Sequence, residues 1–325
     1  MRYRKTEKFP LLVSVIGLGC WGLSGPNVWK ESSDEKSIKV VQKALELGIN
    51  FFDVAPVYGF GHAEEILGKA IKGFPRDKVV IATKCGLIWD QQGRIKRCLT
   101  KESVLSEIDA SLRRLKTDYV DLYQLHWPDP NTPIEETMDA MLKLKDQGKI
   151  RFIGLSNFSV DTAERLLPYI SSMQGLYNLF ERNSRSYHNI PLEYRTESEV
   201  LPFCQKHGLA FFPYSPLMQG VLTGKLSEDE VFTDVRSANP KLVGGNYRKY
   251  IAAVKELKRI ADRYGKPLSQ MSLNWLIKHA AITSIISGAT DPEEVEENAK
   301  TAEWEMTDEV YNEIERVVRE LNVVD

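Results

Sequence analysis

No stretch of this 325-residue chain approaches the run of about 18 apolar residues that a membrane-spanning helix needs. The first residues, Met1 to Lys5, lead into further charged positions and not into the apolar core of a secretory signal. The sequence therefore predicts a cytoplasmic protein that does not enter a membrane.

Cysteine and histidine are both scarce. The chain has five histidines, and its four cysteines form no CxxC pair. These spacings disfavour a disulfide framework and a zinc site, so we expect no metal and reduced thiols packed as small apolar groups. The lack of clustered histidine and aspartate also argues against a metal-dependent barrel hydrolase. The cysteines are Cys20, Cys85, Cys98 and Cys204.

An excess of either charge is also missing. The 43 basic and 45 acidic residues are spread along the chain and leave a net charge of −2, without the basic stripe that nucleic-acid binding requires. Hydrophobic residues make up 42% of the chain, which is enough for a large core. We therefore expect a globular protein acting on small molecules, and no feature selects between a monomer and a homo-oligomer.

Short apolar runs alternate with amphipathic helical stretches along the chain. A helix is expected over residues 35–47, ending before Gly48, and another begins after Thr100, a suitable N-cap residue. The segment at residues 50–53 is interpreted as the first strand. Further strands are expected at residues 78–84, 119–126, 151–155, 173–177, 209–214 and 283–287, and a weaker run near Pro191 or in the 160s brings the count to about eight.

Repeated β-α units imply parallel strands joined by right-handed helical crossovers. A doubly wound open sheet and a closed barrel both satisfy this pattern. The number of units and the absence of a GxGxxG turn after the first strand favour an α/β fold of the (β/α)8 TIM-barrel class. No Ser/Pro-rich linker divides the chain, so residues 1–325 are expected to form one domain. Residues 217–249, rich in glycine and charge, are expected to be a long loop at the C-terminal face, as functional lids are.

Polar side chains stand where several predicted strands end. Asp53, Lys84 and His126 each end an apolar strand, and Tyr58 follows the first strand by one turn of loop. Each has an ordinary interpretation alone, as a helix cap, a solvated strand end, a buried imidazole or a packing aromatic. Because the C-terminal ends of barrel strands converge on one mouth, we expect the four side chains to meet there.

Together these four residues form a set suited to carbonyl reduction. Tyr58 can protonate the carbonyl oxygen, although the ordinary tyrosine pKa of about 10 is high for work near neutral pH. A Lys84 ammonium within about 4–6 Å is expected to lower that pKa, and Asp53 to keep Lys84 charged. His126 is expected to donate a hydrogen bond to the substrate oxygen and to orient it.

The motifs around these residues resemble those of the aldo-keto reductase family. The resemblance extends from Gly17-Leu18-Gly19 to the last helix and is closest to the bacterial branch that acts on sugars, polyols and general aldehydes. It implies an oxidoreductase that moves a hydride between NAD(P)(H) and a carbonyl or alcohol carbon. The motifs are Phe51-Phe52-Asp53-Val54-Ala55 with Tyr58, Ile81-Ala82-Thr83-Lys84, Gln124-Leu125-His126-Trp127-Pro128, Ile153-Gly154-Leu155-Ser156-Asn157-Phe158, Tyr214-Ser215-Pro216-Leu217, Gly220-Val221-Leu222-Thr223-Gly224-Lys225 and the segment at residues 288–298.

The resemblance also implies where the dinucleotide binds. Ser156, Asn157 and Gln174 would hold the nicotinamide carboxamide, and Tyr214 would stack on the ring. The loop at residues 215–225 would cover the pyrophosphate, and residues 288–298 would form the adenosine end. The remaining implied cofactor contacts are Gly19, Cys20, Trp21, Asp53, Ser215, Pro216, Leu217, Gln219, Gly220, Leu222, Gly224, Lys225, Arg236, Gly288, Thr290, Glu294, Glu297 and Asn298.

Charge in the adenosine segment favours NAD(H), or use of both cofactors, over strict use of NADP(H). Residues 288–298 carry five carboxylates and no basic residue, with Thr290 and Glu294 where the family often has basic or amide side chains. Glu294 would repel a 2′-phosphate but can accept a hydrogen bond from a ribose 2′-hydroxyl. In the alternative, these carboxylates face solvent and Lys225 or Arg236 reaches a 2′-phosphate.

Aromatic residues at the predicted mouth favour a polar, hydroxylated substrate, because flat rings suit the C–H faces of a sugar or polyol. The alternative is that the tryptophans only pack the barrel rim. Arg94, Lys96 and Arg97, in a neighbouring loop, either meet a phosphate or carboxylate or form a solvated charged surface. The predicted substrate pocket consists of Trp21, Tyr58, Trp89 and Trp127.

A protein without catalysis is the main alternative from another class. It would bind the nucleotide as a redox-reporting subunit, as channel-associated members of the family do. The complete set of four catalytic candidates argues for an enzyme.

Overall fold

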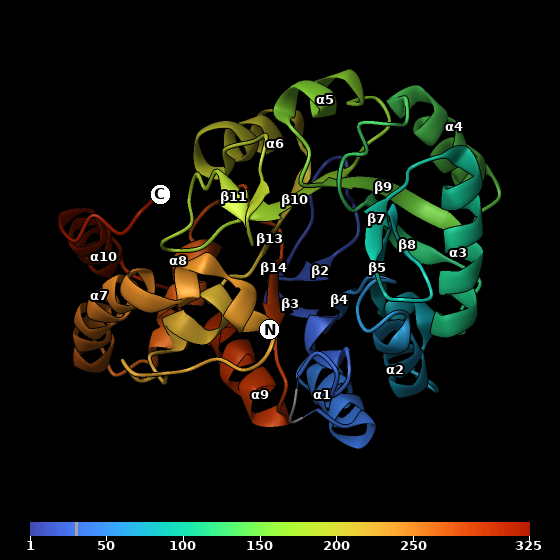
Figure 1. The fold of residues 1–325 in the computed structure, drawn as a ribbon. Coiled ribbons are helices and arrows are strands. Elements are labelled where there is room, and N and C mark those ends of the chain that lie inside the picture. The colour runs from blue at the N-terminus through green and yellow to red at the C-terminus, as the bar shows by residue number, and fades with distance from the viewer. Residues whose placement is uncertain (30–31) are drawn as a thin grey trace.

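The computed structural model describes residues 1–29 and 32–325, and within them eight parallel strands form an inner ring surrounded by helices (Figure 1). The ring closes between β13 and β14, where the Thr283 amide donates to the Phe211 carbonyl at 3.0 Å. The expected (β/α)8 barrel is confirmed. In order around the ring the strands are β13 (Ala210–Tyr214), β10 (Ser172–Leu176), β9 (Ile150–Ser156), β8 (Val120–Leu125), β5 (Val80–Cys85), β4 (Phe51–Asp53), β3 (Ile16–Gly19) and β14 (Ile285–Gly288).

The strand that completes the ring is β3, so the expectation of a strand near Pro191 or in the 160s is wrong. Residues 190–191 form β12 (Ile190–Pro191), which pairs with β11 (Ser186–Tyr187) outside the barrel, and the 160s hold α5 (Val160–Arg165). The segment at residues 51–53 is therefore the second barrel strand and not the first. The reason for the error is that β3 reads Ile-Gly-Leu-Gly, and glycine weakens the usual strand pattern.

Close packing explains one of these glycines. A Cβ at Gly17 would lie 2.7 Å from the ring of Phe51 and 2.9 Å from the Ser284 hydroxyl. Only glycine therefore allows β3 to sit at its observed distance from β4.

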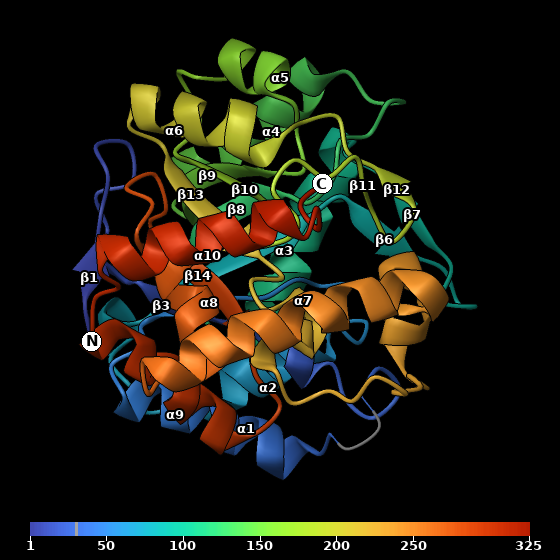
Figure 2. The ribbon, with the colours of Figure 1, turned by 90° about the vertical axis from the view of Figure 1, so that its left-hand side faces the viewer.

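Helices pack against the outer face of the ring. Most follow a barrel strand directly, whereas α7 and α10 are additional helices that contact each other at one side of the barrel (Figures 1 and 2). The helices are α1 (Asp34–Glu46), α2 (His62–Ala70), α3 (Lys101–Leu115), α4 (Ile134–Asp146), α5 (Val160–Arg165), α6 (Leu201–His207), α7 (Gly244–Arg263), α8 (Leu268–Ile277), α9 (Pro292–Lys300) and α10 (Asp308–Glu320). None of the helices in the two described segments is long and apolar enough to cross a membrane.

Helix boundaries follow the local signals in the sequence. The Thr100 hydroxyl accepts a hydrogen bond from the Ser103 amide and caps α3, as expected. Gly48, with φ of +81°, stands two residues after α1 in the left-handed region that ends many helices.

Aromatic side chains fill the N-terminal half of the barrel. Phe9 lies between β1 (Tyr3–Arg4) and β2 (Val13–Ser14), and its ring is 5.7 Å from that of Phe212. Phe212 in turn stacks on Phe51 at 4.6 Å. An interior filled in this way leaves the C-terminal mouth as the place for polar chemistry.

Three insertions stand at that mouth. The hairpin of β6 (Leu87–Trp89) and β7 (Ile95–Arg97) follows β5, and the β11–β12 hairpin follows β10. The third insertion was expected as an irregular loop over residues 217–249, which is partly wrong because α7 begins at Gly244. Two glycines at the start of α7 hide the helix from sequence patterns. Short 3-10 turns at Met218–Thr223, Val235–Ala238 and Pro240–Leu242 order much of the rest.

Candidate active site

The four catalytic candidates come from neighbouring strands of the barrel. Asp53 ends β4, Lys84 is the fifth of six residues in β5, and His126 follows the last residue of β8. Tyr58 lies in the turn after β4, with its backbone amide donating to the Ala55 carbonyl at 3.1 Å. Because β4, β5 and β8 are adjacent, their C-terminal ends deliver these side chains to one part of the mouth.

Lys84 is the centre of this group. Its side chain is 0% exposed, and its Nζ donates to Asp53 Oδ1 at 2.6 Å and to the Val54 carbonyl at 3.1 Å. The Tyr58 hydroxyl lies 3.5 Å from the same nitrogen. A buried ammonium needs such partners, because an unpaired charge away from water is costly.

The second oxygen of the Asp53 carboxylate is held by two amides. Gln124 Nε2 donates to Asp53 Oδ2 at 3.1 Å, and Gln174 Nε2 donates to it at 2.8 Å. Gln174 was an expected cofactor residue, whereas Gln124 was not assigned a role. The only sequence signal for Gln124 is its place two residues before His126 in β8.

The pKa of Tyr58 moves in the opposite direction from the one expected. Burial raises the pKa of the Tyr58 hydroxyl well above its ordinary value, and the charge of Asp53 raises it further. The expectation of a lowered pKa is wrong. Asp53 forms an ion pair with Lys84, so the pair as a whole places little net positive charge beside the phenol. Tyr58 is therefore protonated at neutral pH.

His126 is neutral for a related reason. Burial, and next the nearby Lys84 ammonium, hold the pKa of its imidazole well below the ordinary value. The ring stands edge-on to Tyr58 with their centroids 6.1 Å apart. A neutral imidazole carries one N–H, so His126 can donate a single hydrogen bond.

The predicted carboxamide site is a connected polar cluster. The Ser156 hydroxyl donates to Gln174 Oε1 at 3.4 Å, and Asn157 Nδ2 donates to the His126 carbonyl at 3.1 Å. The hydroxyls of Tyr214 and Tyr194 donate to Asn157 Oδ1 at 2.8 and 3.0 Å. Tyr194 was missed, because it lies well beyond the end of β10, the barrel strand that precedes it in the sequence.

The loop after β13 has an unusual backbone. Ser215, Met218 and Gln219 all have φ near +50°, a conformation that residues other than glycine rarely adopt. Gly220 and Gly224 are also in this region, at +99° and +70°. Such clusters of strained residues are frequent at ligand sites. Pro216 and Leu222 are buried in the same loop, and Leu217 packs against the core.

The side chain of Gln219 has one unsatisfied group. Its Oε1 accepts from Asn239 Nδ2 at 2.8 Å, while its Nε2 is buried without a hydrogen-bond partner among the described residues. An unpaired buried amide costs about 1–3 kcal/mol, so this donor is suited to an acceptor on a ligand.

The two basic side chains expected near the pyrophosphate are both paired with carboxylates. Lys225 Nζ lies 2.9 Å from Glu297 Oε2, and Arg236 Nη2 lies 2.6 Å from Asp234 Oδ2. Glu297 also accepts a hydrogen bond from Ser269. Each cation thus has a carboxylate partner within the chain.

The adenosine segment runs from the end of β14 into α9. Gly288 pairs with Gly19 in the sheet, which in turn pairs with Asp53. Glu294, in the first turn of α9, accepts from the Thr290 amide at 2.8 Å. Asn298, one turn further along α9, is buried. The segment is therefore joined to the mouth through β3.

The predicted substrate aromatics lie on three different segments. Trp21 is in a 3-10 turn with the buried Cys20, and its ring is 6.5 Å from that of Tyr58. Trp89, in β6, lies 5.4 Å from the ring of Phe60. Trp127 is mostly buried beside the Arg97 guanidinium at 5.1 Å.

The basic residues of the β6–β7 hairpin have different surroundings. Arg94 is mostly exposed and pairs with Asp90 at 2.6 Å, so its charge is neutralised within the loop. Arg97 donates to the Pro128 carbonyl at 3.2 Å and lies over Trp127.

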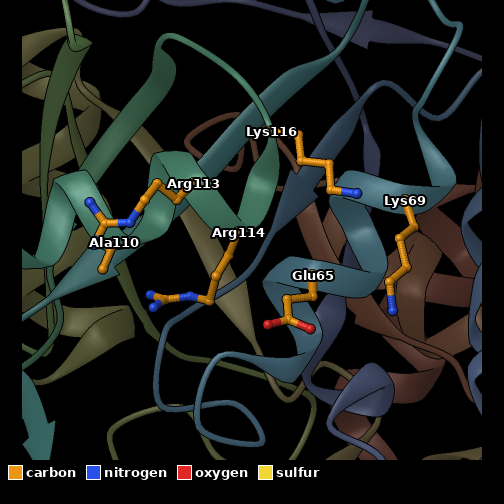
Figure 3. A pocket seen from close by; sticks show the side chains of 6 residues that line it. All are labelled: Glu65, Lys69, Ala110, Arg113, Arg114 and Lys116. Atoms are coloured by element: carbon orange, nitrogen blue, oxygen red, sulfur yellow. The ribbon is translucent and has the colours of Figure 1, made fainter.

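A surface hollow of about 350 Å³ between α2 and α3 is separate from this mouth (Figure 3). Its lining comes from the outer helical layer and includes none of the four catalytic candidates. Arg114, one of its residues, is already paired with the buried Glu64 at 2.6 Å. We therefore assign the hollow no part in the candidate site. Its lining residues are Glu65, Lys69, Ala110, Arg113, Arg114 and Lys116.

Comparison with known proteins identifies the family. The sequence profile of the aldo/keto reductase family matches residues 15–319. Aldo-keto reductase YhdN from Bacillus subtilis is 36% identical over 324 residues, which cover 98% of this chain and 94% of the relative. The NADH-specific methylglyoxal reductase of Escherichia coli is 34% identical over 322 residues, covering 93% and 95%.

A solved structure gives the same result. The glycerol dehydrogenase AKR11B4 from Gluconobacter oxydans superimposes with a TM-score of 0.85 at 31% identity, over 99% of this chain and 97% of that one. The chain therefore belongs to the aldo/keto reductase family and is a nicotinamide-dependent oxidoreductase.

Proposed function

We propose that this enzyme interconverts the carbonyl and alcohol groups of a small polar molecule, with Tyr58 as the proton donor in the reductive direction. The observation that carries the proposal is the Tyr58 hydroxyl, 3.5 Å from a lysine ammonium that is itself buried against Asp53. When bound, the nicotinamide cofactor supplies a hydride to the carbonyl carbon or accepts one from the alcohol.

Each side chain has a distinct part in the proton transfer. Tyr58, protonated at neutral pH, holds the proton that the carbonyl oxygen takes up. Lys84 Nζ, 3.5 Å from the Tyr58 hydroxyl, can donate its remaining N–H to the phenolate oxygen as it forms, and Asp53 keeps Lys84 charged. The neutral His126 donates its N–H to the same oxygen and fixes its direction. In oxidation the proton travels back from the alcohol to Tyr58.

The chain's own groups fit a dinucleotide. Amide and hydroxyl groups of Ser156, Asn157 and Gln174 suit a carboxamide, and the unpaired Gln219 Nε2 suits a phosphate oxygen. The left-handed backbone of residues 215–220 supports the same assignment, because strained loops of this kind persist where they serve binding.

An aromatic side chain at the mouth and the named relatives support a class of substrate. Trp21 beside Tyr58 offers a flat apolar surface next to the reacting oxygen. Relatives named for methylglyoxal and glycerol act on small oxygen-rich molecules, which supports the same class here. We propose aldoses, short hydroxyaldehydes or ketones, or the corresponding polyols.

An aldehyde panel tests this function. With reduced nicotinamide as donor, kcat/KM is expected to be higher for short hydroxyaldehydes and aldoses than for long-chain aldehydes, as measured by loss of cofactor absorbance. A clear preference for long-chain aldehydes would refute the substrate class. Tight cofactor binding with no turnover on any carbonyl compound would instead support a redox-reporting subunit.

We propose that the enzyme prefers NADH to NADPH, or uses both cofactors. Lys225 and Arg236 already have carboxylate partners, Glu297 and Asp234, which compete with a 2′-phosphate for these cations. Glu294 keeps lone pairs for a ribose hydroxyl beyond its bond to Thr290, and its charge repels a phosphate. The relative named as NADH-specific supports this direction.

Titration with NADH and NADPH at equal ionic strength tests the preference. The wild type is expected to bind NADH at least as tightly as NADPH. Glu294→Arg is expected to shift the ratio of the two dissociation constants toward NADPH by about tenfold, which corresponds to roughly 1.4 kcal/mol. Glu293→Arg, an equal change of charge at an exposed neighbour, is the matched control. NADPH binding at least about tenfold tighter to the wild type would overturn the preference.

A further inference from the structure

One buried carboxylate holds both ends of the loop over residues 215–242. Glu181 follows β10, and its side chain is 3% exposed. Its Oε1 accepts from Lys241 Nζ at 2.9 Å, and its Oε2 accepts from Asn178 Nδ2 at 2.8 Å. The two oxygens thus bind different side chains: Asn178 contacts the start of the loop, and Lys241 belongs to its end.

Asn178 leads to the start of the loop. Its Nδ2 also donates to the Ser215 carbonyl at 2.9 Å, using the second of its two hydrogens. Asn178 is fully buried, and Ser215 is the first residue after β13. This contact holds the point where the loop leaves the barrel.

Lys241 leads to the end of the loop. It lies in the 3-10 turn Pro240–Leu242, just before α7, and donates to the Ser184 hydroxyl at 3.0 Å and to the side chain of Asp325. Asp325 is brought there by the segment after α10, and its amide donates to the Phe180 carbonyl at 3.2 Å. This segment meets the chain between β10 and β11, and Figure 2 shows the C-terminus near β11.

A cross-connection joins the two ends. Asn239, two residues before Lys241, donates from Nδ2 to Gln219 Oε1 at 2.8 Å. A displacement of the Lys241 turn therefore acts directly on Gln219.

We propose that Asn178, Glu181, Lys241 and Asp325 form a clamp that keeps the 215–242 loop closed over the cofactor and sets the rate of cofactor release. The inference rests on the proposed function, in which this loop covers the pyrophosphate. The clamp residues are positioning residues, since none of them contacts the Tyr58, Lys84 or His126 side chains.

Electrostatics explains why the clamp holds firmly. Lys241 is only 18% exposed and faces two carboxylates, so opening of the loop would separate these opposite charges and leave the buried Glu181 without its cation. Removing the ammonium leaves Glu181 buried beside Asp325 without a cation. Repulsion and the demand for water at Glu181 then favour opening of the loop.

Lys241→Met tests the clamp. The dissociation rate of NADH, or of NADPH if the wild type binds it more tightly, is measured by stopped-flow displacement through tryptophan fluorescence. We expect a rise of about tenfold, within the usual range of coupling between a remote contact and a ligand, while the single-turnover rate of the chemical step stays unchanged. Lys241→Arg, which keeps the charge, is expected to restore slow release.

Lys149→Met is the matched control. Lys149 forms an ion pair of similar length with Asp109, at 2.6 Å, next to the N-terminal end of β9 and away from the mouth. The proposal is overturned if Lys241→Met releases cofactor at the wild-type rate, if Lys149→Met shows the same rise, or if Lys241→Arg fails to restore it. Should Lys241→Met not fold, Asp325→Asn replaces it under the same criteria. Failure of the proposed function would appear differently, as a wild type that binds neither NADH nor NADPH.

Discussion

Lys84 and Asp53 carry opposite charges in a place that water barely reaches, with side chains 0% and 3% exposed. A buried ion pair of this kind adds little net stability over apolar residues of the same shape, because both charges lose their hydration. Loss of one partner alone is far more costly. The surrounding amides of Gln124 and Gln174 satisfy the remaining carboxylate oxygen, which makes the pair tolerable.

Lys84→Met is therefore expected to lower the free energy of unfolding by about 3–5 kcal/mol, since Asp53 is left buried without its cation. The double variant Asp53→Asn/Lys84→Met is expected to recover most of that stability while its turnover stays low. Urea unfolding of the two variants and the wild type measures the difference. A single variant as stable as the wild type would contradict the assignment of an ionised pair.

The catalytic candidates could be found from the sequence because each stands at a fixed place relative to a strand end. Gln124 could not be found in this way, because an amide inside a strand looks like any other polar residue there. Its role depends on the barrel bringing β8 within reach of Asp53. The pairing of Lys225 with Glu297 and the high pKa of Tyr58 likewise depend on contacts between distant segments.

At the scale of elements, the alternation of strands and helices was predictable and the glycine-rich β3 was not. A strand is recognised in a sequence by its pattern of side chains, and glycine has none. β3 is held in the barrel by its backbone pairing to β4 and β14. The helix start at Gly244 was hidden for the same reason. Glycine-rich elements of this kind can be identified only from their contacts in the folded protein.

Helix α3 is joined to the active-site strand β5 by one carboxylate. Both oxygens of Glu107 accept from the Gly86 amide, at 3.2 and 3.0 Å, and Ser103 donates to one of them. Gly86 directly follows β5 and precedes the β6–β7 hairpin. Burial raises the pKa of Glu107 from 4.5 to about 7.

This shift predicts how stability depends on pH. Because the folded-state pKa is the higher one, the native state binds more protons between pH 4.5 and about 7. The stabilising contribution of Glu107 is therefore complete below about pH 4.5 and is lost as the pH rises through about 7. Between about pH 5 and 8, wild-type unfolding free energy is expected to fall relative to Glu107→Gln by on the order of 2–3 kcal/mol.

Urea titrations of both proteins at the two pH values provide the measurement. Glutamine keeps an acceptor for the Gly86 amide but cannot ionise, so it isolates the charge. Parallel pH profiles for the two proteins would show that Glu107 titrates normally.

At the scale of the whole molecule, apolar rings fill one end of the barrel and a buried polar network fills the other. The fold persists at 31% identity with a TM-score of 0.85, so the scaffold tolerates wide sequence change. The insertions after β5, β10 and β13 follow the C-terminal ends of their strands and so lie at the mouth. We therefore expect substrate preference and cofactor release to be set by these insertions, and the proton transfer by the barrel.

The Tyr58 hydroxyl is the proposed source of the proton, and Tyr58→Phe tests this role most directly because only one oxygen is removed. At saturating cofactor and aldehyde, turnover is expected to fall by about 10²-fold or more, the scale of lost general-acid catalysis, while the dissociation constant of the cofactor stays at its wild-type value. Carbonyl reduction by Tyr58→Phe at close to the wild-type rate would contradict the account.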